Sequence, residues 1–392
     1  MIGCLFALAA IQVFSLQAVQ IVAALTILLG IVPGIGIIGR SESSSARRIG
    51  IAFLLFIIFR SISALYCQDH QAAISALQYP FFALIFIVLA DWPRYLDKNN
   101  ILRLESVWFW AAVIAAIIGI VKYTAGIESR IGTPTGAQIV HEDGTVEGNY
   151  ATFAKFLLFT LLYFGIPWIR SFREKGSIWQ GIGFGILLTG LILTFSRACW
   201  LAAAITVPIF TFKWKPKTTL LGLSAIAVLL VAIPYGRERV RQSLSPTNWS
   251  SGRIELWNVA FDRAVDKPMI GHGIGSFKSI ITRDIRESLP DKGVGDWHNQ
   301  YIQIFMENGI VGILLLCWLM VELFTGFFRI LSNSKDLRTS SAALGGCALL
   351  IGFLIVSLFD TTFNSPHANI SLWFLIGLAL GWLRVESREV VD

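Results

Sequence analysis

The chain has 392 residues, of which 55% are hydrophobic and only 15% are charged, and its mean hydropathy is +0.67. Soluble domains carry about 25% charged residues, so this composition excludes an ordinary soluble protein and favours an integral membrane protein. The net charge of +7 does not indicate nucleic-acid binding here, because basic residues in inner loops hold the orientation of a membrane protein.

Long apolar runs recur from one end of the chain to the other, and each can cross the roughly 30 Å hydrocarbon core of a bilayer. The first run continues into the second without a cleavage site, so we expect a retained span rather than a signal peptide. The sequence predicts an all-α polytopic membrane protein with about twelve spans, or eleven if the first two are one. The predicted spans are 1–17, 19–39, 50–66, 71–90, 106–122, 151–169, 178–195, 198–212, 218–234, 310–328, 341–359 and 368–383.

Basic residues predict the orientation of these spans. With the N-terminus inside, each inner segment carries two or three Lys or Arg, whereas the short outer segments carry only Lys122, Arg130 and Arg197. This bias has the sign of the positive-inside rule, and a long outer segment crosses largely regardless of its charge. The predicted parts are residues 1–234 with nine spans, a large outer loop at 235–309, and residues 310–392 with three spans and an inner C-terminus.

The outer loop contains an amphipathic helix, RIELWNVAFDRAVD, at residues 253–266. Its large apolar residues recur at helical spacing and therefore share one face. Ser250 or Ser251 stands where a helix cap is expected. The residues on the apolar face are Ile254, Trp257, Phe261 and Val265.

A glycine-rich segment and a second amphipathic helix complete the loop. KPMIGHGIGSF at residues 267–277 contains Gly271 and Gly273 after a proline, which is typical of a tight turn. The second helix begins near Trp297 and ends at residues 307–309, where the next span starts. One face of this helix holds His298, Tyr301, Ile302 and Phe305.

Three residues of the outer side are candidates for chemistry. His298 titrates near neutrality and lies at the predicted membrane boundary, although an amphipathic histidine beside Trp297 is also typical of an interface. Arg197 lies in a very short outer turn, where it either snorkels to lipid head groups or binds an anion. Arg253 begins the amphipathic helix, where a guanidinium adds to the positive end of the helix dipole or is an ordinary surface group.

Charged residues within predicted spans need a partner or a cavity. Lys155 lies near the outer end of its span and is a candidate member of an anion site. Arg60 and Glu322 lie deeper, and a structural ion pair is an open interpretation for both. No metal-ligand cluster or nucleotide-binding motif occurs in a suitable context, so we expect a site without metal or cofactor.

Three ordered segments resemble the signature of the O-antigen ligase family. They are LTFSRACWLA at 193–202, SSGRIELWNVA with KPMIGHGIGSF at 250–277, and WHNQYIQIFMENGIVG at 297–312. The family pattern is an S-R-G/A-x-W turn, an S/T-G-R helix start, a P-x-x-G-x-G loop and an H-N helix that ends in E-x-G. Ala198 stands where many members have glycine.

The resemblance implies transfer of an O-antigen glycan from undecaprenyl diphosphate to a sugar hydroxyl of lipid A-core, in lipopolysaccharide biosynthesis. The enzyme would be a metal-independent, inverting, GT-C-like glycosyltransferase of the bacterial inner membrane, with its site in the periplasmic loop. By the motif match, His298 corresponds to the family's catalytic histidine, and Arg197 and Arg253 to its diphosphate-binding arginines. The supporting candidates are Lys155, Asn299, Gly271 and Gly273.

Other functions remain open from the sequence. An O-antigen polymerase uses the same lipid-linked donor, and a protein-glycosylating ligase belongs to the same family. A polytopic transporter or lipid flippase would also have many spans and intramembrane charges, although no repeat symmetry is evident. A transporter would depend on the charges within the spans, whereas the enzyme would depend on Arg197, Arg253 and His298.

Overall fold

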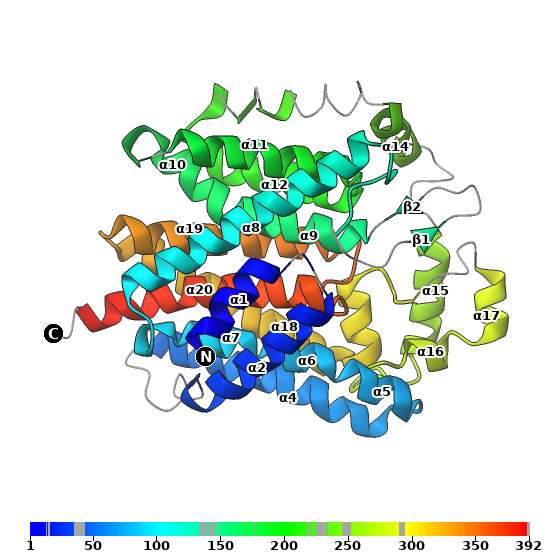
Figure 1. Ribbon diagram of the computed structural model, residues 1–392. Helices are drawn as coiled ribbons and strands as arrows, with labels where there is room; N and C mark the ends of the chain where they lie inside the picture. Colours follow the sequence, from blue (N-terminus) through cyan, green and yellow to red (C-terminus); the bar gives the residue numbers. More distant parts are fainter. Residues whose placement is uncertain are drawn as a thin grey trace.

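The computed structural model shows a bundle of long helices, and a group of short helices packs at one end of the bundle (Figure 1). The residues that the structure describes are 1–389 without 13, 15, 35–43, 134–138, 141–145, 148, 176, 218, 221, 225–231, 233, 245–251 and 290–294.

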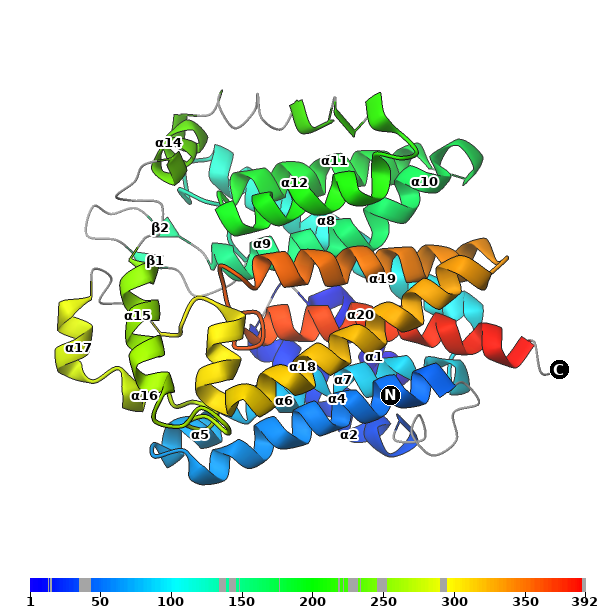
Figure 2. The same cartoon turned by 180° about the vertical axis from the view of Figure 1, so that it is seen from behind.

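The first half of the described chain forms α1 (Ile2–Ile11), α2 (Leu16–Gly34), α4 (Ser44–Ile62), η1 (Ser63–Tyr66), α5 (His70–Ala76), α6 (Gln78–Ala83), α7 (Ile85–Ala90), η2 (Trp92–Arg94), α8 (Lys98–Thr124), an antiparallel pair of β1 (Ile139–Val140) and β2 (Val146–Glu147), α9 (Tyr150–Thr160), the π-helical turn η3 (Leu161–Gly165), α10 (Ile166–Lys175) and α11 (Ile178–Leu193). The second half forms α12 (Arg197–Thr211), α14 (Pro234–Leu244), α15 (Arg253–Ala264), α16 (Phe277–Ile280), α17 (Arg283–Ser288), α18 (Gln300–Asn333), α19 (Leu337–Val356) and α20 (Pro366–Glu389). The long helices α4 and α18 lie side by side along the bundle (Figure 2).

The predicted all-α class and the transmembrane character are confirmed. Among the described residues, six helical stretches are long and apolar enough to cross a membrane: Ser45–Tyr66, His70–Ala90, Lys98–Thr124, Tyr150–Ser171, Gln300–Asn333 and Leu337–Val356. Each overlaps one predicted span. Four shorter apolar helices fall at the predicted spans 1–17, 19–39, 178–195 and 198–212, and 368–383 lies in α20. The predicted span 218–234 lies largely outside the described residues, so the number of about twelve stays a prediction.

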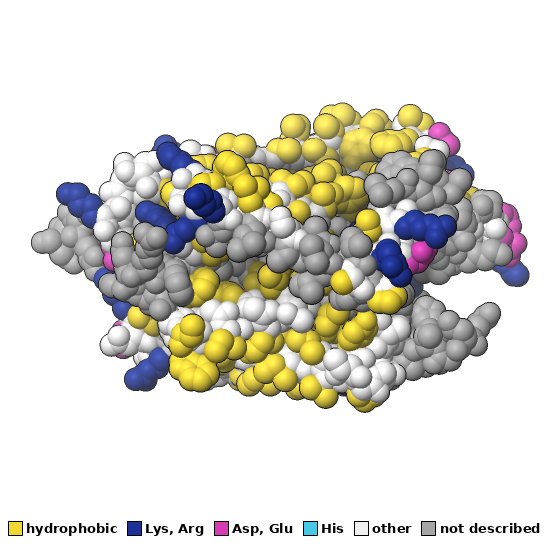
Figure 3. Space-filling view, turned by 90° about the horizontal axis from the view of Figure 1, so that it is seen from above, with side chains coloured by type: hydrophobic (Ala, Val, Ile, Leu, Met, Phe, Trp, Pro, Cys, Tyr) yellow, Lys and Arg dark blue, Asp and Glu magenta, His cyan; other side chains and the backbone are white. Residues whose placement is uncertain are grey.

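The surface divides into an apolar middle and charged ends. In Figure 3, hydrophobic side chains gather over the middle of the molecule, and Lys and Arg lie toward its two ends. Several large apolar side chains in the spans are more than half exposed, including Leu28, Val121 and Leu314. Exposed apolar area of this extent is rare on soluble monomers and is covered by lipid tails in a membrane protein.

The longest helix, α18, is kinked at Gly309, which has φ +61° and ψ −161°. A kink leaves helical N–H and C=O groups without their usual partners. The glycine-rich segment supplies new ones: the amides of His272 and Gly273 donate to the carbonyls of Met306 and Glu307, and the amides of residues 310 and 311 donate to carbonyls of residues 268 and 269. The break predicted near residues 307–309 is therefore present, and the glycine-rich segment forms four backbone hydrogen bonds with it.

This pairing explains the glycines in KPMIGHGIGSF. Gly271 has φ +74° and Gly273 has φ +94°, which side chains rarely allow. A Cβ atom on Gly271 would lie 2.5 Å from the backbone nitrogen of Asn308, and one on Gly273 would lie 2.6 Å from the carbonyl oxygen of Ser63. Gly271 lets the loop approach the kink of α18, and Gly273 lets it approach η1, so the contacts of both glycines are architectural.

Helix α15 forms over the predicted residues, but it does not bury its largest side chains. It packs through small or medium residues, with Leu256, Ala260 and Ala264 buried. On the predicted apolar face, Phe261 is 57% exposed and Val265 is 75% exposed. Both sets have helical spacing, and the smaller set lets the helix lie close to the cluster around Trp297 and Phe277. The proposed caps at 250 and 251 lie outside the described residues.

Candidate active site

His298 stands two residues before the start of α18, in a fixed backbone conformation. Its φ is +48°, which is uncommon for a residue with a side chain. Its amide donates to Asp296 Oδ1 at 2.8 Å. The next residue, Asn299, caps α18 by accepting the amides of Tyr301 and Ile302. Because the backbone is held on both sides, the direction of the Cα–Cβ bond of His298 is set.

Two carboxylates face one nitrogen of this imidazole. His298 Nδ1 lies 3.4 Å from Asp296 Oδ1 and 4.0 Å from Asp360 Oδ1. Burial by itself lowers the pKa of the imidazole, but Asp360 and Asp296 outweigh it, so the pKa of His298 is raised above its ordinary value of 6.5. The side chain of His298 is still 31% exposed, which leaves it accessible.

Asp360 joins His298 to Lys155, a predicted supporting residue. Lys155 Nζ lies 3.0 Å from Asp360 Oδ2 and also donates to the Thr361 carbonyl at 2.7 Å. The Thr361 hydroxyl donates in turn to Asp296 Oδ2 at 2.6 Å. Burial raises the pKa of Asp360, but the charge of Lys155 and the contact with His298 hold that pKa well below its usual range. The charged form of Asp360 is therefore favoured between Lys155 and His298.

Arg253 lies on the same side as His298. It is the first residue of α15, after Gly252 in a left-handed conformation at φ +74°. One turn further, the Trp257 indole donates to the Trp297 carbonyl at 2.8 Å, which ties α15 to the residue before His298. The charge of Arg253 lowers the pKa of His298, so the guanidinium is within electrostatic range of the imidazole. Arg253 is half-buried.

Arg197 begins α12 at the same end of the bundle. The turn before it places Phe195 at φ +52° with its ring fully buried. Two residues after Arg197, Cys199 is within electrostatic range of both Lys155 and Asp360. The structure therefore brings the turn of Arg197 next to the Lys155–Asp360 pair, and Arg197 itself is half-buried.

Each charge predicted within a span has an ionic partner. Arg60 Nη2 contacts Glu307 Oε2 at 2.8 Å, with both side chains almost fully buried. Glu307 Oε1 also accepts from Gln303 Nε2 and from the amide of Gly275. On the outside of α18, Glu322 contacts Arg48 at 3.0 Å, and the arginine is 43% exposed. The open interpretation of structural ion pairs fits Arg60 and Glu322.

The sequence interpretation missed Asp296, Asp360 and Thr361. Asp296 stands two residues before His298, so the sequence alone could have indicated that this carboxylate lies near the imidazole. Asp360 and Thr361 follow the predicted span 341–359, and an acidic residue directly after a span on the outer side is a weak signal. Only the packing of α9 against α20 and α19 places Asp360 beside Lys155, which is 205 residues away in the chain.

Part of the chain matches a known family model. Residues 182–317 match the family model described as O-antigen ligase. This range contains Arg197, Arg253, the glycine-rich segment and His298, whereas Lys155 and Asp360 lie outside it.

Curated relatives are similar at low identity. An uncharacterized protein of Haemophilus influenzae is 21% identical over 80% of this chain and 80% of its own. A putative polysaccharide ligase of Rickettsia conorii is 21% identical over 75% of this chain and 70% of its own. The exopolysaccharide production protein ExoQ of Rhizobium meliloti is 22% identical over 58% and 55%.

A chain in a solved structure of a peptidoglycan synthase complex aligns with 87% of this chain and 97% of its own, at 17% identity and a TM-score of 0.44, which is too low to establish a shared fold. The family match and the curated names agree with the three motifs, so the predicted resemblance is confirmed: residues 182–317 of this multi-pass membrane protein are similar to the O-antigen ligase family model.

Proposed function

We propose that this protein is an O-antigen ligase of the bacterial inner membrane. It transfers an O-antigen glycan from undecaprenyl diphosphate to a sugar hydroxyl of lipid A-core on the periplasmic face, as a step in lipopolysaccharide biosynthesis. Support comes from the O-antigen ligase match over residues 182–317 and from the polysaccharide ligase name of a relative. The spans supply the membrane context that a lipid-linked donor requires.

The observation that carries this proposal is the environment of the His298 imidazole. Its Nδ1 faces the carboxylates of Asp296 and Asp360, which favours a proton on Nδ1. The opposite nitrogen, Nε2, has no hydrogen-bond partner among the described residues, and the ring is partly exposed. This arrangement suits a general base, because Nε2 takes a proton while the carboxylates stabilise the imidazolium that forms.

In the proposed reaction, the acceptor hydroxyl attacks the anomeric carbon of the glycan. The bond from that carbon to the phosphate oxygen breaks, and undecaprenyl diphosphate leaves with the bonding electrons. The acceptor proton moves to Nε2 of His298. A single displacement of this kind inverts the anomeric centre.

Charge develops on the diphosphate as the bond breaks, and guanidinium groups stabilise it without a metal ion. Arg253 and Arg197 each begin a helix at this end of the bundle, where the backbone amides of the first turn add positive potential. Lys155 is engaged by Asp360, so in this proposal it holds that carboxylate beside His298 rather than binding the donor as a free cation. The lipid-facing apolar side chains accommodate the polyprenyl tail.

The test is glycan transfer by the purified full-length protein with lipid-linked donor, lipid A-core and EDTA. We expect the wild type to transfer, and His298→Ala to lose about 10²-fold or more of the rate, the usual contribution of a positioned base. The matched control is His70→Ala, because His70 is an exposed residue at the start of α5, and it should keep the wild-type rate.

Each result has a separate meaning. Full activity of His298→Ala would remove this residue from the mechanism. Lengthening of the lipid-linked glycan without transfer to lipid A-core would make the protein a polymerase. Loss of wild-type activity in EDTA that added Mg²⁺ restores would refute a metal-independent reaction.

A further inference from the structure

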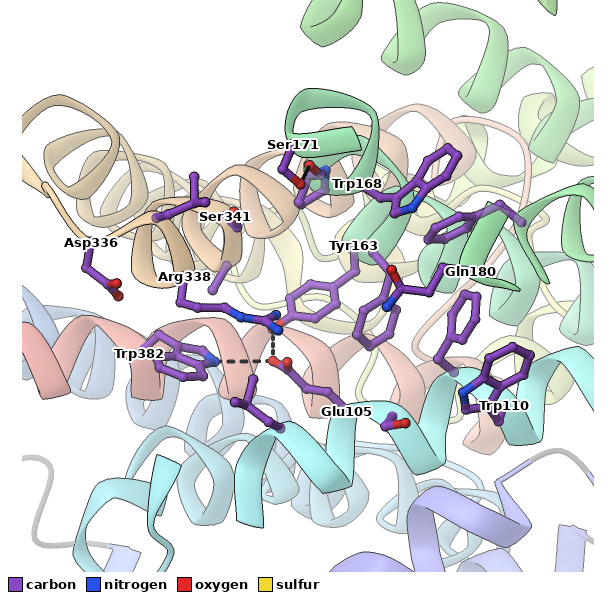
Figure 4. A pocket seen from close by; sticks show the side chains of 18 residues that line it. Glu105, Trp110, Tyr163, Trp168, Ser171, Gln180, Asp336, Arg338, Ser341 and Trp382 are labelled. Carbon is purple, nitrogen blue, oxygen red and sulfur yellow. Dashed lines mark hydrogen bonds between the residues drawn. The ribbon is translucent and has the colours of Figure 1, made fainter. Parts of the chain in front are cut away.

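A cavity of about 450 Å³ lies between α8, η3, α10, α11, α19 and α20. Figure 4 shows its lining, with Glu105, Arg338 and Trp382 on one side and Trp110, Gln180 and Trp168 on the other. The π-helical turn η3 directs Tyr163 into it. Such turns are frequent at functional sites.

The cavity is far from the candidate active site. It includes residues at the start of α19, whereas Asp360 follows the end of that helix. A helix of 20 residues is about 30 Å long, so the two sites occupy opposite ends of the bundle. By the predicted orientation, the cavity opens at the inner leaflet.

The lining holds opposite charges at different depths. Glu105 is only 9% exposed, and its Oε1 accepts from the Tyr163 hydroxyl and the Trp382 indole at 3.2 Å each. Its second oxygen has no hydrogen bond among the described residues. Arg338 is exposed and acts electrostatically on Glu105, but it does not form an ion pair with it in the described part of the chain. A buried carboxylate of this kind favours a cationic partner.

The walls suit an organic ammonium group. Trp110, Tyr163, Trp168 and Trp382 all line the cavity, and aromatic faces attract ammonium cations. Apolar side chains continue from Trp110 along the lipid-facing side of α8, where Ile114 is 51% exposed and Ile117 is 43% exposed. A ligand with an ammonium group, an anionic group and apolar tails fits the aromatic walls with Glu105, the guanidinium of Arg338 and the apolar side of α8.

We propose that this cavity binds the zwitterionic head group of an aminophospholipid from the inner leaflet. The ammonium lies against the free oxygen of Glu105 among the aromatic rings, the phosphate contacts Arg338, and the acyl chains follow α8. The site is independent of glycan transfer, because it is defined by residues that the proposed reaction does not use.

The test measures lipid retention by the purified full-length protein. The protein is incubated in mild detergent with equal amounts of phosphatidylethanolamine and phosphatidylglycerol, and bound lipid is quantified by native mass spectrometry. We expect phosphatidylethanolamine to be retained about tenfold over phosphatidylglycerol, a difference that corresponds to about 1.4 kcal/mol. Glu105→Gln and Arg338→Gln should each bring the ratio close to one.

The matched control is Glu322→Gln, because Glu322 is a carboxylate on α18 outside the cavity, and it should keep the wild-type ratio. Arg338 is exposed, so its variant tests the proposal even if Glu105→Gln does not fold. Equal retention of both lipids by the wild type, or an unchanged ratio in Arg338→Gln, would overturn the site.

A second arm separates a lipid from a soluble ligand. Millimolar phosphoethanolamine is added before the lipids. Retention of phosphatidylethanolamine despite the competitor supports a membrane source. Binding of phosphoethanolamine without retained lipid would refute the proposal that the ligand comes from the membrane.

Discussion

Replacing Asp360 by asparagine tests whether His298 works as the base. The change keeps the shape of the side chain and removes a negative charge 4.0 Å from His298 Nδ1. At that distance two unit charges interact by about 1 kcal/mol in water and about 4 kcal/mol near a protein surface. Because the imidazole is 31% exposed, we take a value near the lower end. One pKa unit is about 1.4 kcal/mol, so the pKa of His298 should fall by about one unit.

The direction of the pKa change at His298 follows from the negative charge that the substitution removes. A carboxylate stabilises the imidazolium and raises the pKa of His298, so its loss makes the proton easier to remove. Lys155 loses its ionic partner in the same variant, and its positive charge acts in the same direction. The acid limb of kcat/KM, which reports the free enzyme, should therefore move to lower pH by about one unit.

The assay is the pH profile of glycan transfer between about pH 5 and pH 9, on variants with wild-type gel-filtration and melting behaviour. Asp296→Asn should shift the limb in the same direction, because Asp296 also faces Nδ1. Asp262→Asn is the control, since Asp262 is an exposed carboxylate on α15, and its limb should stay in place. An acid limb that stays fixed or moves upward in Asp360→Asn would refute the assignment of that limb to His298.

Two further predictions concern the packing that holds the site. Gly309→Ala should lower the free energy of unfolding by about 1–3 kcal/mol, because the backbone conformation is nearly restricted to glycine and the new Cβ would lie 2.4 Å from the Met269 carbonyl. Gly185→Ala is the control, because the space around its Cβ is open. Equal melting temperatures of the two variants would contradict the prediction. Arg60→Met should destabilise by about 3–5 kcal/mol by leaving Glu307 buried without its cation, and adding Glu307→Gln should recover part of that loss. A thermal double-mutant cycle with purely additive effects would refute this coupling.

The spans were predictable because each is a local property of the sequence. A run of apolar residues long enough to cross a bilayer can be recognised without knowing which segments pack against it. Within the described part of the chain, six long helical stretches and four shorter apolar helices lie where the sequence predicts spans. The break near residues 307–309 was likewise predictable, because Gly309 ends an amphipathic pattern and begins a uniformly apolar one.

The packed face of α15 was not predictable from periodicity alone. Its sequence has two sets of apolar residues at helical spacing, and the set of larger residues, such as Phe261, is the predicted apolar face. The structure buries the smaller set around Ala260 instead. Close approach to the cluster with Trp297 favours small residues, so side-chain volume at the contact decided the outcome rather than total hydrophobicity.

The partners of the charged residues also required the tertiary structure. Lys155 contacts Asp360, and Arg60 contacts Glu307, across 205 and 247 residues of chain. No spacing rule relates such positions. A charge in a predicted span signals only that a partner exists, and the sequence offers several acidic candidates for each.

The motif residues divide between chemistry and architecture, and the division follows from what each one touches. Glu307 and the glycines at 271 and 273 form hydrogen bonds and close backbone contacts around the kink of α18. His298 is the motif residue whose side chain faces carboxylates and solvent together. The first group holds the start of α18 against α4, and the start of α18 positions His298. Substitution of an architectural residue should therefore lower stability and activity together, whereas His298→Ala should remove activity from a protein that still melts at the wild-type temperature.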